Sequence, residues 1–135
     1  MSYSDSLAGV TADHLHGFFV GWNNPPTPET HLRLLHGSYA VWLAKDGERV
    51  VGFITAISDG VLAAFIPNLE VLPAYQHQGI GAELVRRMLA TLGSLYSIDL
   101  ICDENVQPFY ERVGGRRYSG MVWRNYARQS GSLME

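Results

Sequence analysis

Hydrophobic positions along this chain alternate between helical and strand spacing, which predicts a mixed domain of helices and strands. The clearest helix spans about 79–92, where apolar residues return every three or four positions and polar ones occupy the other face. Two apolar runs, 39–44 and 50–57, flank an Asp-Gly pair and predict a β-hairpin. A third run, 61–72, contains Pro67, which predicts a bulge because proline has no N–H to donate.

The remaining segments complete the predicted architecture. Short helices are expected at 11–20, 27–37 and 105–114, and a strand is expected at 97–102. Residues 116–127 are expected to form one or two final strands. This order of elements predicts an α+β, or mixed α/β, fold of three layers.

Length and composition narrow the class of protein. With 135 residues, 47% of them hydrophobic, the chain fits one globular domain at 1–127 and a flexible tail at 128–135. The single cysteine, Cys102, excludes an internal disulfide and a cysteine-built zinc site, and the histidines show no metal-ligand spacing. Neither a membrane helix nor a signal peptide is visible, so a cytoplasmic protein without a membrane partner is expected.

Charge is distributed unevenly along the chain. The formal net charge of -3 argues against a nucleic-acid partner held by a general basic surface. Residues 1–75 carry three basic and seven acidic side chains, whereas residues 76–135 carry seven and six. The acidic first half favours a cationic partner, although ordinary surface charge explains it more simply.

Residues 76–82 carry the main chemical signal in the sequence. They lie between a predicted strand and the amphipathic helix, and they include Gly79 and Gly81. Glycines let successive backbone N–H groups face a phosphate, and the helix N-terminus adds a partial positive charge. The segment is neither a Walker loop nor a dinucleotide fingerprint. It indicates an anion site, with plain turn geometry as the alternative.

Together with a second motif, this segment resembles the GNAT acetyltransferase superfamily. The first family motif, Gln/Arg-x-x-Gly-x-Gly/Ala after a strand ending in Val-x-Pro, is matched by Gln76, Gly79 and Gly81. The second, an asparagine opening a helix with Phe-Tyr before a glycine turn, is matched by Asn105, Phe109, Tyr110 and Gly114. The resemblance covers about residues 39–125 and departs from the family at Gly115, where phenylalanine is usual. It implies a mostly antiparallel central sheet with a splayed strand pair, flanked by helices.

The resemblance also implies acetyl-coenzyme A as co-substrate, and no metal is expected because the histidines lack metal-ligand spacing. The pyrophosphate of the coenzyme would be bound by a loop of seven residues: Gln76, His77, Gln78, Gly79, Ile80, Gly81 and Ala82. The pantetheine arm would lie along Leu69 and Val71 like an added strand, with the Val71 N–H polarising the thioester carbonyl. Asn105 would also bond that arm, although an N-cap role is more common for an asparagine at this place.

Two side chains are candidates for proton transfer. The resemblance implies that Tyr110 protonates the departing thiolate, with core packing as the alternative role. Glu70 is the candidate base for the attacking amine, directly or through water, because its place on the strand brings a carboxylate beside the thioester. An exposed surface glutamate is its alternative role. Trp22, Trp42 and Trp123 are expected in core packing rather than in an acceptor pocket.

The sequence therefore predicts an N-acetyltransferase that transfers acetyl from acetyl-coenzyme A directly to a primary amine of a small molecule. Two alternatives stay open: a non-catalytic module that binds or senses acyl-coenzyme A, and an enzyme that acetylates a protein lysine or N-terminus. Exposed strand edges near the C-terminus favour a homodimer.

Overall fold

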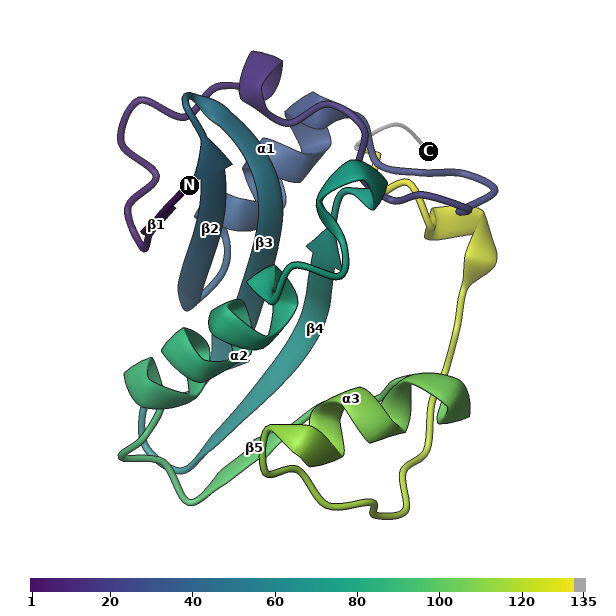
Figure 1. Cartoon of the computed structure of the whole chain (residues 1–135). Coiled ribbons are helices and arrows are strands. Elements are labelled where there is room, and N and C mark those ends of the chain that lie inside the picture. The colour runs from purple at the N-terminus through teal and green to yellow at the C-terminus, as the bar shows by residue number, and fades with distance from the viewer. Residues whose placement is uncertain (133–135) are drawn as a thin grey trace.

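A five-stranded sheet with helices on both faces organises the computed structural model, which describes residues 1–132 (Figure 1). In order across the sheet, the strands are β1 (Ser2–Ser4), β2 (Ala40–Asp46), β3 (Arg49–Ser58), β4 (Ala63–Val71) and β5 (Ser97–Asp99). All neighbouring pairs are antiparallel except β4 and β5, which run parallel. The predicted α+β fold with a mostly antiparallel sheet is confirmed, and β1 is an addition that the sequence patterns did not indicate.

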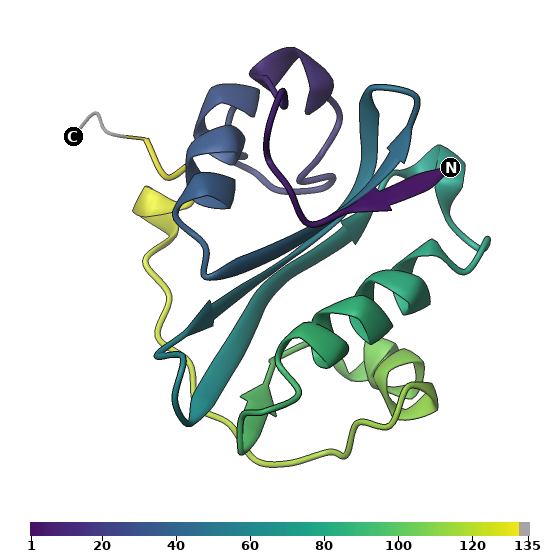
Figure 2. The same ribbon diagram turned by 90° about the vertical axis from the view of Figure 1, so that its left-hand side faces the viewer.

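The helices α1 (Pro28–His36), α2 (Ile80–Thr91) and α3 (Gln107–Arg112) are divided between the two faces, with α1 on one and α2 and α3 on the other (Figure 2). Adjacent residues of β3 show why three layers form. The Phe53 ring centroid lies 4.3 Å from that of His31 in α1. A Cβ on Gly52 would lie 3.2 Å from the Leu84 side chain of α2. Alternate strand residues thus reach opposite helices.

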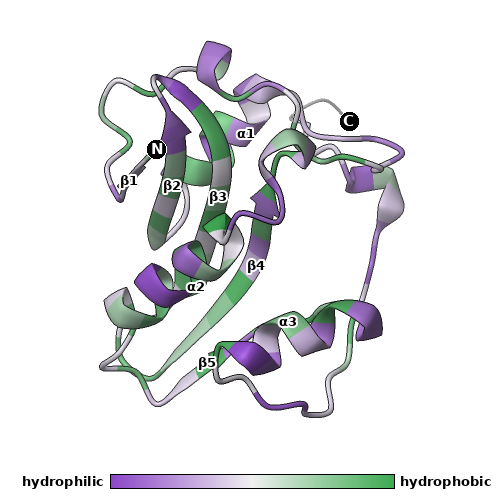
Figure 3. Cartoon of the chain, in the orientation of Figure 1, coloured by the Kyte–Doolittle hydropathy of each residue, from purple (hydrophilic) through white to green (hydrophobic). Residues whose placement is uncertain are grey.

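The two longer helices begin where their sequences predict. Thr27 Oγ1 accepts a hydrogen bond from the Thr30 N–H at 3.1 Å, which caps α1, and Pro28 occupies its first turn. Helix α2 follows Gly79 and buries a stripe of four residues against the sheet: Ile80, Leu84, Val85 and Met88. Hydrophobic residues concentrate on the strands, whereas the outer face of α2 is hydrophilic (Figure 3). None of the helices in residues 1–132 has both the length and the apolar composition needed to cross a membrane.

The prediction of a helix at 11–20 is wrong. Only Ala12–His14 forms a short 3-10 turn, and the chain then bends through Gly17, Phe19 and Gly21, whose φ angles are +96°, +62° and +84°. These left-handed residues interrupt the helical ladder. The N–H groups of Phe19 and Val20 instead donate to the Glu70 carboxylate. A partner some fifty residues away in sequence therefore determines the conformation of this segment.

The expected strands within 116–127 are also absent from the described chain. Residues 116–125 run extended without pairing to the sheet, and Tyr126–Arg128 forms a 3-10 turn. Of the tail predicted at 128–135, Gln129 accepts a hydrogen bond from the Asn24 N–H at 2.9 Å, and the Gly131 carbonyl accepts one from Arg33. The last three residues, 133–135, lie outside the described residues.

Candidate active site

Strands β4 and β5 separate soon after they pair. The parallel ladder joins only Ala63–Phe65 of β4 to Ser97–Asp99 of β5, whereas β4 stays paired with β3 as far as Val71. The register between β3 and β4 shifts between Thr55 and Ile57, opposite Ile66 and Pro67, which confirms the predicted bulge. From the bulge onward, β4 therefore has an edge with no strand paired to it among residues 1–132.

A cavity of about 360 Å³ occupies the opening beside this edge. Its walls come from β4, from the chain that diverges after β5, from the start of α3 and from the loop before α1: Ile66, Pro67, Leu69, Leu100, Ile101, Cys102, Asp103, Val106, Tyr110 and Trp22. Trp22 is thus a wall of this opening and not a core residue, contrary to expectation. A single acidic side chain, Asp103, lies among mostly apolar ones.

The loop at 76–82 lies at the far end of β4, where α2 begins. The Gln76 side-chain amide donates to the Val71 carbonyl at 3.0 Å, which ties the loop to the strand. His77 and Gly79 have φ angles of +64° and +83°, and a Cβ on Gly79 would meet nothing within 4 Å. The turn itself therefore requires the left-handed residue, and it leaves the N-terminus of α2 open to solvent. The first N–H groups of a helix have no intrahelical partner, so this end can hold an anion.

Gly81 has a different role from Gly79. A Cβ at Gly81 would lie 3.4 Å from the Phe109 ring and 3.8 Å from Val71, so its missing side chain lets α2 approach α3 and the end of β4. The two glycines of the motif therefore do separate things: one permits the turn and the other permits close packing.

Asn105 lies in the short 3-10 turn Glu104–Val106 that precedes α3, and its side chain is exposed. The N-cap residue of that turn is Asp103, and that of α3 is Val106. Asn105 therefore caps neither helix, so the N-cap alternative is wrong. Its side chain is exposed, and it is not among the residues that line the opening beside β4.

Tyr110 is half-buried in α3 beside the opening of the sheet. Its ring meets that of Phe109 edge-on at 5.0 Å. Burial, followed by the nearby Cys102 thiol, raises the pKa of Tyr110 to about 12, so its hydroxyl stays protonated at physiological pH. No group of residues 1–132 forms a hydrogen bond with this hydroxyl, which leaves it available to a ligand.

The Glu70 carboxylate accepts hydrogen bonds from two backbone groups, Phe19 N–H at 2.8 Å and Val20 N–H at 3.2 Å. Through these two hydrogen bonds Glu70 anchors the loop at 17–22. The same loop carries Trp22, whose ring centroid lies 4.9 Å from that of Phe19. Each carboxylate oxygen has a second lone pair, so both can still accept a proton or a water molecule. The sequence did not indicate this anchoring role, because it depends on a contact between distant segments.

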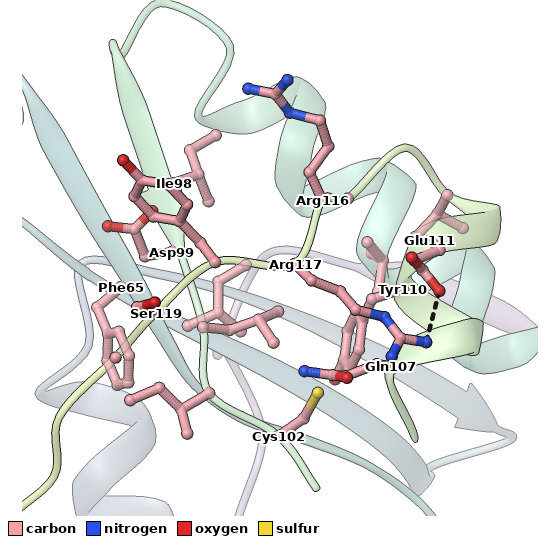
Figure 4. A pocket seen from close by; sticks show the side chains of 18 of the residues that line it. Phe65, Ile98, Asp99, Cys102, Gln107, Tyr110, Glu111, Arg116, Arg117 and Ser119 are labelled. Atoms are coloured by element: carbon pink, nitrogen blue, oxygen red, sulfur yellow. Dashed lines mark hydrogen bonds and ion pairs between the residues drawn. The ribbon is translucent and has the colours of Figure 1, made fainter. Parts of the chain in front are cut away.

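A second, larger cavity of about 490 Å³ lies on the outer side of β5 (Figure 4). Tyr110, Gln107 and Cys102 line one side of it, and residues 115–122 line another. Cys102 is half-buried rather than fully buried, and burial raises the pKa of its thiol, with the Asp103 charge adding to the effect. The thiol is therefore protonated at neutral pH and poorly suited as a nucleophile. Among residues 1–132, no cluster of three potential metal ligands is found.

A splayed sheet, a glycine turn before an amphipathic helix and a tyrosine beside the splay are the features that the resemblance to the GNAT superfamily implies. Residues 7–115 match the model of the acetyltransferase (GNAT) family. The chain belongs to this family, which confirms the resemblance seen in its motifs.

Known relatives agree with this assignment. A chloroplastic protein of Arabidopsis thaliana, GCN5-related N-acetyltransferase 3, is 40% identical over 77 residues, which are 56% of this chain and 32% of that protein. The chain spans between about a third and two thirds of the length of such curated relatives.

Two solved structures are similar over nearly the whole chain. A protein of Deinococcus radiodurans R1, provisionally assigned as an acetyltransferase, has a TM-score of 0.93 and 48% identity, and the match covers 96% of this chain and 91% of that one. A GNAT-family acetyltransferase of Streptococcus pneumoniae TIGR4 has a TM-score of 0.72 and 34% identity, covering 92% and 96%.

Proposed function

We propose that this protein is an N-acetyltransferase that moves the acetyl group of acetyl-coenzyme A to a primary amine of a small molecule. The observation that carries the proposal is the opening beside β4, which has the glycine loop at one end and Tyr110 in its wall. An extended ligand with an anionic end and a reactive end fits an opening of this arrangement.

The residues around the opening suit the two parts of the coenzyme. Backbone N–H groups of residues 76–82 would hold the pyrophosphate at the N-terminus of α2. The unpaired edge of β4 at Leu69 and Val71 would accept the pantetheine arm as an added strand, and the exposed Asn105 amide would bond it from the other side. In this arrangement, the Val71 N–H is the donor proposed for the thioester carbonyl.

The chemistry supplied by acetyl-coenzyme A is acyl transfer, in which the amine nitrogen bonds to the carbonyl carbon and the carbon–sulfur bond breaks. Tyr110 holds a proton at Oη for the departing sulfur. A thiol has a pKa of roughly 8.5, so a complete transfer from a hydroxyl with a pKa of about 12 would be uphill by itself. Tyr110 therefore donates toward sulfur while its oxygen regains a proton from the attacking nitrogen, and the two transfers are coupled.

Glu70 is proposed to receive the proton that makes the amine nucleophilic, through a water molecule on the lone pairs that Phe19 and Val20 leave free. The size of the opening supports a small acceptor, since the coenzyme arm and the amine would share its volume of about 360 Å³ beside Trp22. Asp103 at its rim would attract a cationic ammonium group.

A panel of amines tests the proposal directly. Purified protein is mixed with acetyl-coenzyme A and each amine, and release of free thiol is measured. Turnover with small amines, together with an acetylated product identified by mass spectrometry, is expected. Tight coenzyme binding by calorimetry without turnover of any amine would identify a binding module instead. Turnover confined to peptide lysines or N-termini would identify a protein acetyltransferase.

Replacing Glu70 by glutamine is expected to lower kcat at pH 7 by about 10²-fold, a usual loss when a proton acceptor is removed. Activity should recover as the pH rises, because the amine then loses its proton without help. The control is Glu48→Gln, which changes a carboxylate on the β2–β3 turn whose side chain is 91% exposed. If the loss were equal at every pH and accompanied by a higher KM for the amine, Glu70 would only position the loop at 17–22.

Replacing Gly79 by alanine is expected to raise the Kd for acetyl-coenzyme A about tenfold, equal to about 1.4 kcal/mol. A Cβ disfavours the left-handed conformation by about 1–2 kcal/mol, so the loop relaxes and its N–H groups turn away from the pyrophosphate. Gly47→Ala is the matched control, since Gly47 also has a positive φ, +63°, with open space around it, but lies in the β2–β3 turn. Calorimetry on both variants compares the two effects, and equal affinities would contradict the loop's role.

A further inference from the structure

The tryptophans of the chain lie in different surroundings. Trp42 packs against the core as expected, and its indole N–H donates to the Thr91 hydroxyl at 2.9 Å. Trp123 is 86% exposed, so the expectation of core packing is wrong for it. Trp22 is 42% exposed and lines the opening beside β4. The Trp22 ring is therefore accessible to a molecule that enters this opening.

Trp22 is held in place by a chain of contacts that begins at Glu70. The Trp22 N–H donates to the Phe19 carbonyl at 3.2 Å, and the two rings meet edge-on with 61° between their planes. Phe19 itself is only 5% exposed, and its N–H donates to the Glu70 carboxylate. A side chain fixed in this way loses little conformational freedom when a ligand binds, which suits a recognition surface.

Trp22 and the coenzyme loop belong to opposite faces of the sheet. The segment with Trp22 leads into α1, whereas residues 76–82 lead into α2, and these two helices cover opposite faces (Figure 2). The Glu70 carboxylate lies on the side of Trp22, because it bonds the N–H groups of Phe19 and Val20. Since Glu70 is proposed to receive the proton of the amine, the amine would approach from the side of Trp22.

The lining of the opening is poor in charge. Of the residues within 1–132 that line it, only Asp103 is charged, and most of the others are apolar. One carboxylate can pair with one ammonium group, whereas a second positive charge would lose its water against apolar walls without a partner. The lining therefore favours an amine with a single positive charge and an apolar body.

We propose that Trp22 determines which acceptor is used, and that this acceptor is a monoamine whose planar apolar group packs against the indole ring. The inference rests on the proposed acetyltransferase function and narrows its substrate class. The ammonium group would first pair with Asp103 at the rim of the opening. A planar ring gains more than buried area from an aromatic neighbour, because edge-on and offset-stacked contacts add a favourable electrostatic interaction. Polyamines gain no such contact and are expected to be poor acceptors.

Amines of different shape test the proposal: 2-phenylethylamine, ethylamine, which lacks the ring, and spermidine, which carries several charges. Their kcat/KM values are measured with purified protein and saturating acetyl-coenzyme A. The value for 2-phenylethylamine is expected to exceed each of the others by at least about tenfold. Trp22→Ala should lower that value by about tenfold and leave the value for ethylamine nearly unchanged. Trp22→Phe should restore most of the loss, since it returns an aromatic ring.

Tyr39→Ala is the matched control. It removes another aromatic side chain, 55% exposed and placed just before β2, which is not among the residues that line the opening. Its kcat/KM values should equal those of the wild type for every amine. Circular dichroism checks that each variant is folded, and calorimetry checks that its Kd for acetyl-coenzyme A is that of the wild type.

Several results would overturn the inference while the acetyltransferase proposal stands. An equal loss for ethylamine and 2-phenylethylamine in Trp22→Ala would place the ammonium group, and not the apolar body, against the indole. A higher Kd for acetyl-coenzyme A in that variant would assign Trp22 to the coenzyme. Turnover of spermidine as efficient as that of 2-phenylethylamine would show that the opening does not select for a single charge.

A protein that acetylates none of these amines is tested by binding instead. Calorimetry then measures the Kd for 2-phenylethylamine with the protein saturated with coenzyme A. A Kd that is about tenfold higher in Trp22→Ala than in the wild type would support the recognition role of Trp22, even though the proposed catalysis had failed. Equal affinities of the two proteins, or no binding to either, would overturn that role.

Discussion

Tyr110→Phe is expected to lower kcat by about 10²-fold while leaving the affinity for acetyl-coenzyme A nearly unchanged. The substitution removes one hydroxyl and keeps the ring, so the edge-on contact with Phe109 remains. No group of residues 1–132 hydrogen-bonds this hydroxyl, so its loss leaves no protein partner unsatisfied. The loss of kcat should therefore arise at the step in which the sulfur departs, because the sulfur would leave without a proton donor. Steady-state kinetics with acetyl-coenzyme A and the best amine of the panel measure it.

The pH profile adds a second readout for Tyr110. Since burial raises its pKa to about 12, its own ionisation should not lower the activity of the wild type between neutral and mildly alkaline pH. Tyr96→Phe is the control, because Tyr96 is 86% exposed and lies outside the site. An unchanged kcat in Tyr110→Phe would remove Tyr110 from the acid role and return it to packing.

The free energy of unfolding is expected to fall by about 3 kcal/mol between pH 7 and pH 4 because of His31 alone. This side chain is 1% exposed, is surrounded by the rings of Phe18, Phe19 and Phe53, and leaves both ring nitrogens without a hydrogen-bond partner among the described residues. Burial lowers its pKa from 6.5 to about 4. Between about pH 4 and 6.5, His31 therefore binds a proton in the unfolded chain and stays neutral in the folded chain. The stability is complete above about pH 6.5 and is lost as the pH falls toward 4.

His31→Leu isolates this contribution from those of the carboxylates, which remain in both proteins. Urea unfolding at several pH values should show a slope between pH 4 and 6.5 that is smaller in the variant, by about 3 kcal/mol over the range. At pH 7 the variant should be at least as stable as the wild type, because leucine buries no unsatisfied nitrogen. Parallel pH profiles for the two proteins would show that His31 is hydrated or hydrogen-bonded in solution.

Local signals in the sequence determined much of the scaffold. The capped α1, the amphipathic α2 and the hairpin of β2 and β3 rest on contacts between residues close in sequence, so spacing and turn residues suffice to predict them. Pro67 also marked the irregular point of β4 correctly, because a missing N–H has the same effect in any sheet. The two GNAT motifs were recognisable for the same reason, since each occupies one continuous segment.

Only the tertiary structure decided the segments whose hydrogen bonds lie far away. Residues 11–20 have helix-forming apolar spacing, yet the Glu70 carboxylate accepts hydrogen bonds from the N–H groups of Phe19 and Val20, and the helix does not form. Residues 116–125 have strand-forming side chains, but a strand exists only beside a partner edge, and the described chain pairs them with none. Periodicity shows which face of a segment is apolar, and the long-range packing determines what that face and its backbone will meet.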